Sequence, residues 1–214
     1  MNTLLNGAIK KILSITPSNI YAVGGNGTIV HYNGNSWQRI ESGTDLPIQD
    51  IWGAYNEATG EYEILAVASK IMEDLGERQI LKITGNQTVT LDQAGMYGYM
   101  SGVWFVPNTK YYIVGSGVFR KRSLNGSSPW VRYEPGEVTQ YFSFDIKGNA
   151  LNDIFVVGSF AEIVHFNGIN WKTYHNIPTY IDNFYSLDFK KNLMLAVGSS
   201  RYGRNAVLVV GRRK

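Results

Sequence analysis

Residues 20–37 read IYAVGGNGTIVHYNGNSW, and residues 154–171 repeat this pattern as IFVVGSFAEIVHFNGINW. The two copies keep a constant distance, because each matched residue, such as His165 against His31, is separated by 134 positions. A pattern that recurs at a fixed spacing is typical of folds built from stacked copies of one structural unit. The two stretches therefore predict a repeat protein.

Each copy has the pattern of short antiparallel strands. Residues 20–24 are apolar on both sides of the pleat, which is expected of a strand with both faces covered. The glycines of residues 24–27 accept positive φ angles at low cost and predict a tight hairpin into the next strand. A second turn follows at residues 33–35, where Asn and Gly predominate. The first unit therefore has four expected strands, near residues 12–16, 20–24, 28–32 and 37–41.

A Val-Gly or Val-Ala step ends the second strand of each unit and gives the period. The steps are Val23-Gly24, Val67-Ala68, Val114-Gly115, Val157-Gly158 and Val197-Gly198, at spacings of 44, 47, 43 and 40 residues. Five units therefore fill the chain as a single domain of residues 1–214. We place the units at about 9–45, 46–95, 98–136, 139–178, and 182–214 together with 1–6.

The ends of the chain suggest how the units are arranged. The fifth unit has three expected strands, whereas residues 2–5 form a spare β-capable segment before the first unit. In a closed ring this segment can pair as the missing outer strand and leave few edges unprotected. A linear solenoid would need polar caps at both ends, which neither terminus resembles. We therefore predict an all-β, five-bladed β-propeller with four antiparallel strands per blade, closed by the N-terminal segment.

Composition limits the function classes. The 214 residues are 44% hydrophobic and 17% charged and contain no cysteine, which permits a large core without disulfides and excludes thiol catalysis and Cys-ligated zinc. A net charge of +3 is too small to indicate nucleic-acid binding. No apolar run reaches membrane-spanning length. We expect a soluble protein of undetermined compartment, extracytoplasmic or secreted if an upstream signal was removed and otherwise cytoplasmic.

The sequence also lacks the short motifs of metal, phosphate and nucleophile chemistry. It contains no H-E-x-x-H, G-x-S-x-G or P-loop pattern. His31 and His165 occupy the same position in two units, so a ring would place them on separate blades. We therefore expect no metal and no cofactor.

The unit NIYAVGGNGTIVHYNGNSW, together with DIWG at residues 50–53, resembles glycine-rich bacterial propeller repeats of the photosystem-assembly-factor-like, sialidase-like and kelch-like groups. The resemblance extends over the whole chain through repetition and specifies the fold better than the activity. The S-x-D-x-G-x-T-W box of sialidases is absent from the corresponding corners at residues 33–37 and 167–171. Five-bladed propellers of this broader kind include tachylectin-type lectins and furanosidases, so the resemblance implies either sugar binding or sugar cleavage.

One candidate site lies at the predicted axis. Alignment of the innermost strands by their apolar neighbours gives one equivalent position to Ser14, Trp52, Trp104, Asp145 and Asp188. Asp145 and Asp188 would then lie on adjacent blades, and a carboxyl pair with one member protonated can cleave glycosides. The structural alternative, which we favour, is that each carboxylate accepts backbone hydrogen bonds or pairs with a neighbouring lysine.

A second candidate site lies on the rim that carries the loops between blades and the middle hairpins. The candidate ligand-binding residues there are Tyr97, Tyr99, Tyr141, Tyr180, Arg201 and Tyr202. Exposed tyrosines beside polar groups suit sugar rings and equally suit a protein hot spot. The alternative is that these tyrosines cover the ends of the blade core.

The sequence therefore favours a non-enzymatic, lectin-like binding module that presents rim loops to a glycan or a protein partner. Two other roles remain open, a glycoside hydrolase that uses the axial carboxylates and a structural module of a larger surface or assembly protein. Ligand identity and oligomeric state are not specified by these patterns.

Overall fold

The computed structural model describes residues 4–70, 77–174, 177, 181–200 and 205–212, and every regular element in these residues is a β-strand. The nineteen strands of this described part form five antiparallel sheets, which we number blades 1 to 5 in chain order. Four blades have four strands and blade 5 has three. No helix in the described residues is long and apolar enough to cross a membrane.

The strand bounds follow the predicted repeat. Blade 1 contains β1 (Ile9–Thr16), β2 (Asn19–Gly24), β3 (Ile29–Tyr32) and β4 (Trp37–Arg39). Blade 2 contains β5 (Ile48–Asn56), β6 (Glu61–Ser69), β7 (Arg78–Thr84) and β8 (Gln87–Thr90). Blade 3 contains β9 (Met100–Val106), β10 (Lys110–Gly115), β11 (Val118–Lys121) and β12 (Val131–Arg132). Blade 4 contains β13 (Ser143–Ala150), β14 (Asp153–Gly158), β15 (Ile163–Phe166) and β16 (Trp171–Thr173). Blade 5 contains β17 (Ile181–Lys190), β18 (Leu193–Ser200) and β19 (Ala206–Arg212).

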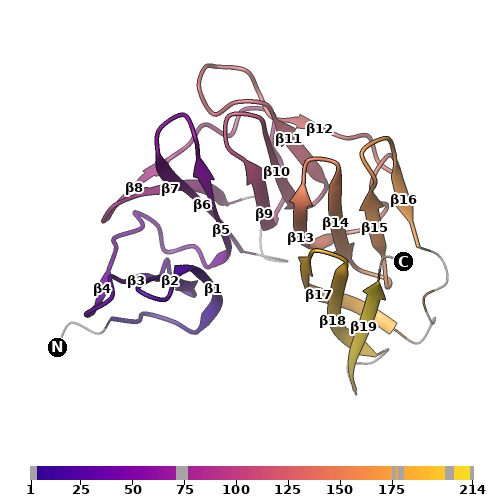
Figure 1. Ribbon diagram of the computed structural model, residues 1–214, viewed down its shortest axis with the longest axis horizontal. Coiled ribbons are helices and arrows are strands. Elements are labelled where there is room, and N and C mark those ends of the chain that lie inside the picture. The colour runs from indigo at the N-terminus through magenta and orange to yellow at the C-terminus, as the bar shows by residue number, and fades with distance from the viewer. Residues whose placement is uncertain (1–3, 71–76, 175–176, 178–180, 201–204, 213–214) are drawn as a thin grey trace.

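The blades stand side by side around an arc, with the first strand of each on the inner side (Figure 1). These first strands pack against one another in order, β1 on β5, β5 on β9, β9 on β13 and β13 on β17. The other strands of each sheet follow outward in chain order. The predicted five-bladed β-propeller is therefore confirmed.

Blades 1 and 4 repeat each other in detail as well as in outline. His31 Nε2 lies 2.8 Å from Asn19 Oδ1, and the His31 ring stacks on Tyr21. At the equivalent positions of blade 4, His165 Nε2 lies 2.8 Å from Asp153 Oδ1 and the ring stacks on Phe155. The two histidines thus occupy matching structural positions on separate blades, as their spacing predicts.

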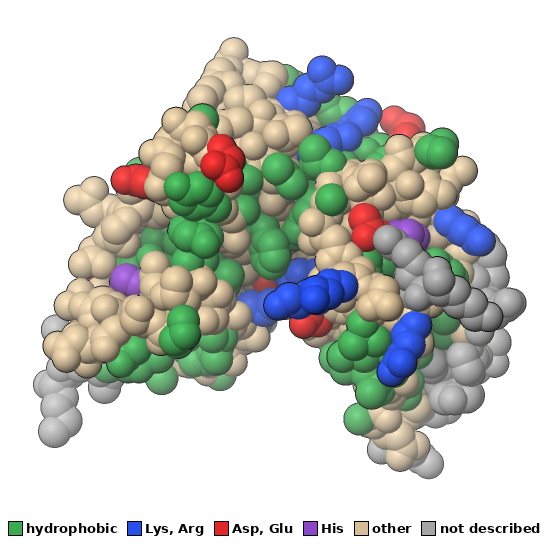
Figure 2. Space-filling view, in the orientation of Figure 1, with side chains coloured by type: hydrophobic (Ala, Val, Ile, Leu, Met, Phe, Trp, Pro, Cys, Tyr) green, Lys and Arg blue, Asp and Glu red, His purple; other side chains and the backbone are tan. Residues whose placement is uncertain are grey.

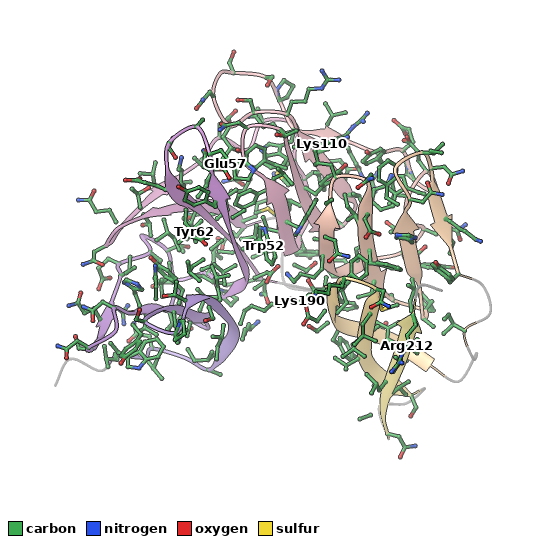
Figure 3. All side chains as sticks on the ribbon, viewed as in Figure 1. Trp52, Glu57, Tyr62, Lys110, Lys190 and Arg212 are labelled. Carbon is green, nitrogen blue, oxygen red and sulfur yellow. The ribbon has the colours of Figure 1, made fainter. Side chains whose placement is uncertain are left out.

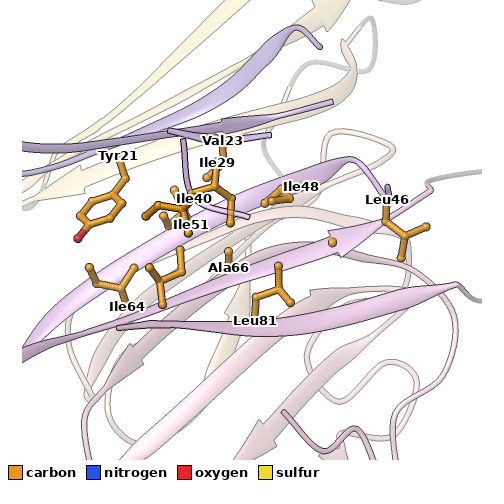
Figure 4. Close-up of a cluster of buried hydrophobic side chains, with 12 residues drawn as sticks. Tyr21, Val23, Ile29, Ile40, Leu46, Ile48, Ile51, Ile64, Ala66 and Leu81 are labelled. Carbon is orange, nitrogen blue, oxygen red and sulfur yellow. The ribbon is translucent and has the colours of Figure 1, made fainter. Parts of the chain in front are cut away.

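The hydrophobic core lies between neighbouring blades. Between blades 1 and 2, for example, the buried side chains of Tyr21, Ile29 and Ile40 form one cluster with Ile64 and Leu81 (Figure 4). Similar clusters join blades 2 and 3, blades 3 and 4, and blades 4 and 5. Because each sheet buries apolar side chains on a neighbour, the blades stabilise one another and a single blade has no core of its own.

The predicted closure of the ring by the N-terminal segment is wrong. In the described residues β19 pairs with β18 alone, so blade 5 remains three-stranded. Leu4 and Leu5 belong to no strand and are exposed. Residues 1–3, which include the first two of the predicted pairing residues, are outside the described part.

The physical reason is that the N-terminal segment has another set of partners. Gly25 N–H donates to Ala8 O, just as Ser159 N–H donates to Phe142 O at positions 134 residues later. Residues 6–8 therefore occupy, in blade 1, the place that residues 140–142 occupy in blade 4. They form the incoming connection to the innermost strand of blade 1 and are not available to blade 5.

As a result the arc is open between blade 5 and blade 1, and Figure 2 shows a hollow on that side. Val197 and Leu208 of blade 5 face each other across β18 and β19 and are 45% and 58% exposed. Their equivalents in blade 2, Val67 and Ile80, are fully buried against blade 3. The outward face of blade 5 thus has the apolar pattern of a blade interface but no neighbouring blade among the described residues.

Candidate functional site

The axial position is occupied by a different set of residues from the one that the sequence alignment predicts. The residue opposite the valine of each Val-Gly or Val-Ala step is Lys11, Asp50, Gly102, Asp145 or Ser186 in blades 1 to 5. Asp145 therefore belongs to this ring, whereas Asp188 lies two residues farther along its strand. Trp52 and Trp104 also lie two residues beyond the ring members of their blades, and Ser14 lies three residues beyond Lys11. Residues with similar apolar neighbours recur every second position of a strand, so in blades 2, 3 and 5 a shift of two preserved the pattern.

The axial side chains form an alternating cluster of charges. Lys11 Nζ lies 3.5 Å from Asp50 Oδ1 and 3.1 Å from Asp145 Oδ2. Lys147 Nζ lies 3.5 Å from Asp50 Oδ2 and 3.4 Å from Asp145 Oδ1. Lys147 Nζ is also 5.0 Å from the ring centre of Trp52, which Figure 3 labels at the inner end of blade 2. The two lysines and the two aspartates thereby neutralise one another in a largely buried cluster.

Both axial aspartates also tie one blade to the next. Asp50 accepts a hydrogen bond from Val103 N–H on blade 3, and Asp145 accepts hydrogen bonds from Leu187 N–H and the Ser186 hydroxyl on blade 5. Burial by itself raises the pKa of Asp145, but Lys147, Lys11 and the Leu187 amide outweigh burial and hold this pKa below its usual value. Asp145 is therefore a buried, ionised structural carboxylate, which is unsuited to donate a proton to a glycosidic oxygen.

Asp188 does not join this cluster. It is exposed, and its Oδ1 accepts a hydrogen bond from the N–H of its neighbour Phe189. The two carboxylates named as a possible acid/base pair thus have different environments, one buried among lysines and one in solvent. This arrangement matches the structural alternative, in which each carboxylate accepts a backbone hydrogen bond.

The rim tyrosines have individual environments. Tyr97 is 48% exposed and its ring meets Phe119 edge-on, while Tyr141 is 45% exposed. Tyr99 is half-buried, and its N–H donates to Ser116 Oγ at 2.9 Å. Tyr180, Arg201 and Tyr202 lie outside the described residues. The described rim tyrosines lie on the connections that enter blades 3 and 4.

A cavity of about 190 Å³ opens beside these tyrosines, between the hairpin at Ser116 and the connection at residues 133–142. Arg132, at the end of β12, forms part of its wall. The guanidinium donates to Ser116 O at 3.0 Å and lies 4.9 Å from the ring centre of Tyr97. Arg132 Nε is buried and has no hydrogen-bond partner among the described residues. The cavity wall therefore contains a cationic donor with unused hydrogen-bonding capacity.

Gly117 is required for this placement of the guanidinium. A Cβ at this position would lie 2.3 Å from Arg132 Nε, well inside van der Waals contact. Gly117 thus lets the guanidinium approach the backbone of the β10–β11 hairpin.

The other side of the cavity is anchored by Glu162. This buried side chain accepts hydrogen bonds from Gln140 N–H at 2.9 Å and Tyr141 N–H at 3.4 Å. Burial raises the pKa of Glu162, although the two amide hydrogen bonds oppose that effect. The carboxyl group fixes the backbone of Tyr141 relative to the β14–β15 hairpin.

That hairpin presents the most exposed aromatic side chain of the described rim residues. Phe160 is 68% exposed, and its ring centre lies 4.5 Å from that of Tyr141. Phe160 and Ala161 have φ angles of 56° and 58°, which the equivalent Asn26 and Gly27 of blade 1 adopt at 49° and 61°. Asn-Gly is favoured in such a turn, whereas each residue with a larger side chain costs roughly 1–2 kcal/mol there.

We call Tyr97, Arg132, Tyr141, Phe160 and the adjoining cavity the rim site. Sequence reasoning had proposed the two tyrosines and had not named Arg132 or Phe160. The signal for Phe160 was present in the repeat, because the second copy has Phe-Ala where the first has Asn-Gly. No such signal marked Arg132, whose role depends on the fold bringing the hairpin at Ser116 beside β12.

The described residues contain no group of three or more His, Cys, Asp or Glu side chains that could hold a metal ion. The comparisons with known proteins concern the fold. No protein-family model matches the sequence, and no curated protein matches it.

Solved structures share the architecture at low sequence identity. The structure titled YCF48 bound to D1 peptide matches 98% of this chain with a TM-score of 0.66 and 14% identity. YCF48 from Cyanidioschyzon merolae matches 97% of this chain and 68% of its own, with a TM-score of 0.66 and 12% identity. The WD40 repeats of RRP9 match 97% of this chain and 68% of their own, with a TM-score of 0.62 and 14% identity.

This chain spans 65% of the length of the first of these structures. The matches place the protein in the class of β-propellers, in agreement with its blades and its repeat. At these identities they show the fold and leave the function to be argued from the rim site.

Proposed function

We propose that the chain is a non-enzymatic binding module that engages a protein partner through the rim site. The observation that carries this proposal is the turn at Phe160. Phe160 is exposed and has a positive φ angle, and the equivalent turn of blade 1 has Asn-Gly in the same conformation. Costly backbone geometry is usually retained where it serves a function. Here its effect is to hold an aromatic ring against Tyr141 at the edge of a cavity.

The chemistry of the rim site fits a protein surface. Tyrosine and arginine are the side chains most enriched at protein hot spots, and aromatic rings provide large contact area. The cavity of about 190 Å³ is smaller than the roughly 300–1,000 Å³ of an ordinary small-molecule pocket and is suited to one side chain. Arg132 in the cavity wall provides a positive charge that a carboxylate of that partner can pair with.

The test is a selection of linear peptides from a displayed random library on the purified protein. We expect peptides that combine an aromatic or aliphatic anchor with an acidic residue. Their affinity should fall at least about tenfold with Phe160→Ala or Tyr141→Ala, since hot-spot truncations cost on the order of 2 kcal/mol.

Tyr62 provides the matched control. Tyr55 and Tyr62 form another exposed aromatic pair, with ring centres 5.4 Å apart, on the β5–β6 hairpin of blade 2. Figure 3 labels Tyr62 there. Tyr62→Ala should leave peptide binding unchanged. Equal losses in the Tyr62 and Phe160 variants would contradict the assignment of the rim site.

Sugar binding is a second candidate, favoured by the partly exposed rings of Tyr97 and Tyr141 near Arg132. C–H faces of sugars stack on such rings while hydroxyls bond polar groups. A glycan array distinguishes the two functions. Saturable glycan binding that Tyr141→Ala abolishes, with no peptide selected, would replace the protein-partner proposal.

A further inference from the structure

The outer edge of blade 5 differs from that of every other blade. In blades 1 to 4 the third strand pairs with a fourth antiparallel strand. In blade 5 the third strand, β19, pairs only with β18 among the described residues. Within the described part of the chain, one side of this seven-residue strand therefore has no partner strand, and another extended segment can complete it.

An apolar cavity lies directly beside this edge. It has a volume of about 280 Å³ and separates blade 4 from blade 5. Its lining includes Phe155 and Tyr174 from blade 4, and Phe189, Met194, Val209 and Arg212 from blade 5. Figure 3 labels Arg212 at the end of β19.

In blade 2 an apolar side chain fills the position that corresponds to this cavity. Gly211 pairs with Met194 in blade 5, as Ile83 pairs with Ile64 in blade 2. Ile83 is buried in the core between blades 1 and 2, so a glycine at the equivalent position leaves space where an isoleucine side chain would lie. The absence of this side chain therefore enlarges the cavity.

Blade 2 also shows what normally covers this place. Thr88 on the fourth strand lies opposite Ile83, and its hydroxyl donates to Glu41 O of blade 1. Asn86, which directly precedes that strand, donates to Gln38 Oε1 of blade 1. Blade 5 has no such strand among the described residues, so the slot beside blade 4 is neither filled nor covered.

We propose that β19 is a docking edge for an extended segment of a partner protein, which adds as the fourth antiparallel strand of blade 5. Its residue opposite Gly211 carries a bulky apolar side chain into the cavity, since cross-strand neighbours share a sheet face. The segment is acidic near its start, because Lys172 occupies the position equivalent to Gln38 and Arg212 lies at the cavity wall. This edge is separate from the rim site.

The chain itself supplies the design of a probe. The probe is a fluorescein-labelled peptide with the sequence of residues 84–91, which includes the fourth strand of blade 2, and it carries Asn86→Asp and Thr88→Phe. The aspartate is placed to meet Lys172, and the phenylalanine is placed to enter the cavity. A peptide of the same composition in scrambled order is the control for non-specific binding.

We expect saturable binding of the designed peptide by fluorescence anisotropy and none of the scrambled one. Gly211→Ile fills the cavity as Ile83 does in blade 2, so it should weaken binding at least about tenfold. It should not lower the melting temperature, because a Cβ there meets the flexible end of Met194 at 3.2 Å and Gly211 has no positive φ. Val197→Ser, on the exposed opposite face, should bind as the parent does.

A charge exchange keeps the proposal testable if Gly211→Ile fails to fold. Lys172→Glu should weaken the designed peptide several-fold, and a peptide with Asn86→Lys should restore binding to that variant. No binding to the parent, or binding indifferent to both substitutions, would overturn the proposal. Dimerisation of the parent that Gly211→Ile abolishes would also overturn it, because the occupant would then be a second copy.

Discussion

Lys11 Nζ lies 3.1 Å from Asp145 Oδ2, and the two residues occupy the same repeat position 134 residues apart. This contact joins the first blade to the fourth across the axis of the molecule. Burial would lower the pKa of Lys11, but Asp50 and Asp145 raise it above its ordinary value. The axial cluster therefore connects two blades that are not adjacent.

Loss of the Asp145 charge should destabilise the fold. Asp145→Asn leaves Lys11 and Lys147 with one carboxylate between them, and breaking a buried ion pair costs roughly 3–5 kcal/mol. We expect a clear fall in the urea midpoint. Asp188→Asn is the matched control, because Asp188 is exposed and should shift stability by less than about 0.5 kcal/mol. Equal urea midpoints for the two variants would contradict a stabilising role of the axial cluster.

The same carboxylate predicts an acid dependence. The pKa of Asp145 is depressed in the folded protein, so the unfolded chain takes up a proton first as the pH falls. Its contribution to stability is present above the unfolded pKa of about 3.9 and is lost as the pH falls through the lower folded pKa. Urea midpoints measured from pH 6 downward should therefore fall more steeply for the parent than for Asp145→Asn. Parallel curves would mean that Asp145 does not provide this dependence.

Glu162 should control the order of the rim site. Glu162→Ala removes the acceptor of Gln140 N–H and Tyr141 N–H, and a hydrogen bond of this kind contributes roughly 0.5–1.5 kcal/mol. Amide hydrogen exchange at these two residues should become faster, with little change at the equivalent connection into blade 1. Exchange that is unchanged at Gln140 and Tyr141 would show that the carboxyl group does not hold this connection.

The sequence contained most of the architecture. The 134-residue offset predicted equivalent positions for His31 and His165, and the structure gives them partners at equivalent positions, Asn19 and Asp153. Strand periodicity and turn residues are local properties, so they can be read from a single unit. The turn at residues 24–27 and its counterpart in blade 4 are examples.

Longer-range features were less predictable. The pairing of the N-terminal segment was wrong because β-propensity cannot distinguish an outer strand from the incoming connection that Ala8 forms with Gly25. The axial alignment was displaced by two residues in blades 2, 3 and 5, because side chains on one face of a strand recur with that period. The rim site depends on Arg132 meeting Tyr97 and on Tyr141 meeting Phe160, contacts that only the packed blades create.

The measurement that tests the rim site most directly uses the turn of blade 1 to replace that of blade 4. The double variant Phe160→Asn, Ala161→Gly lowers the cost of the positive φ angles, which Asn26 and Gly27 also adopt, and removes the exposed ring. We predict a higher melting temperature, from a gain of about 1–2 kcal/mol, and a loss of binding to peptides selected on the parent. A variant that binds these peptides as the parent does would contradict the proposal that Phe160 is held in this turn to engage a partner.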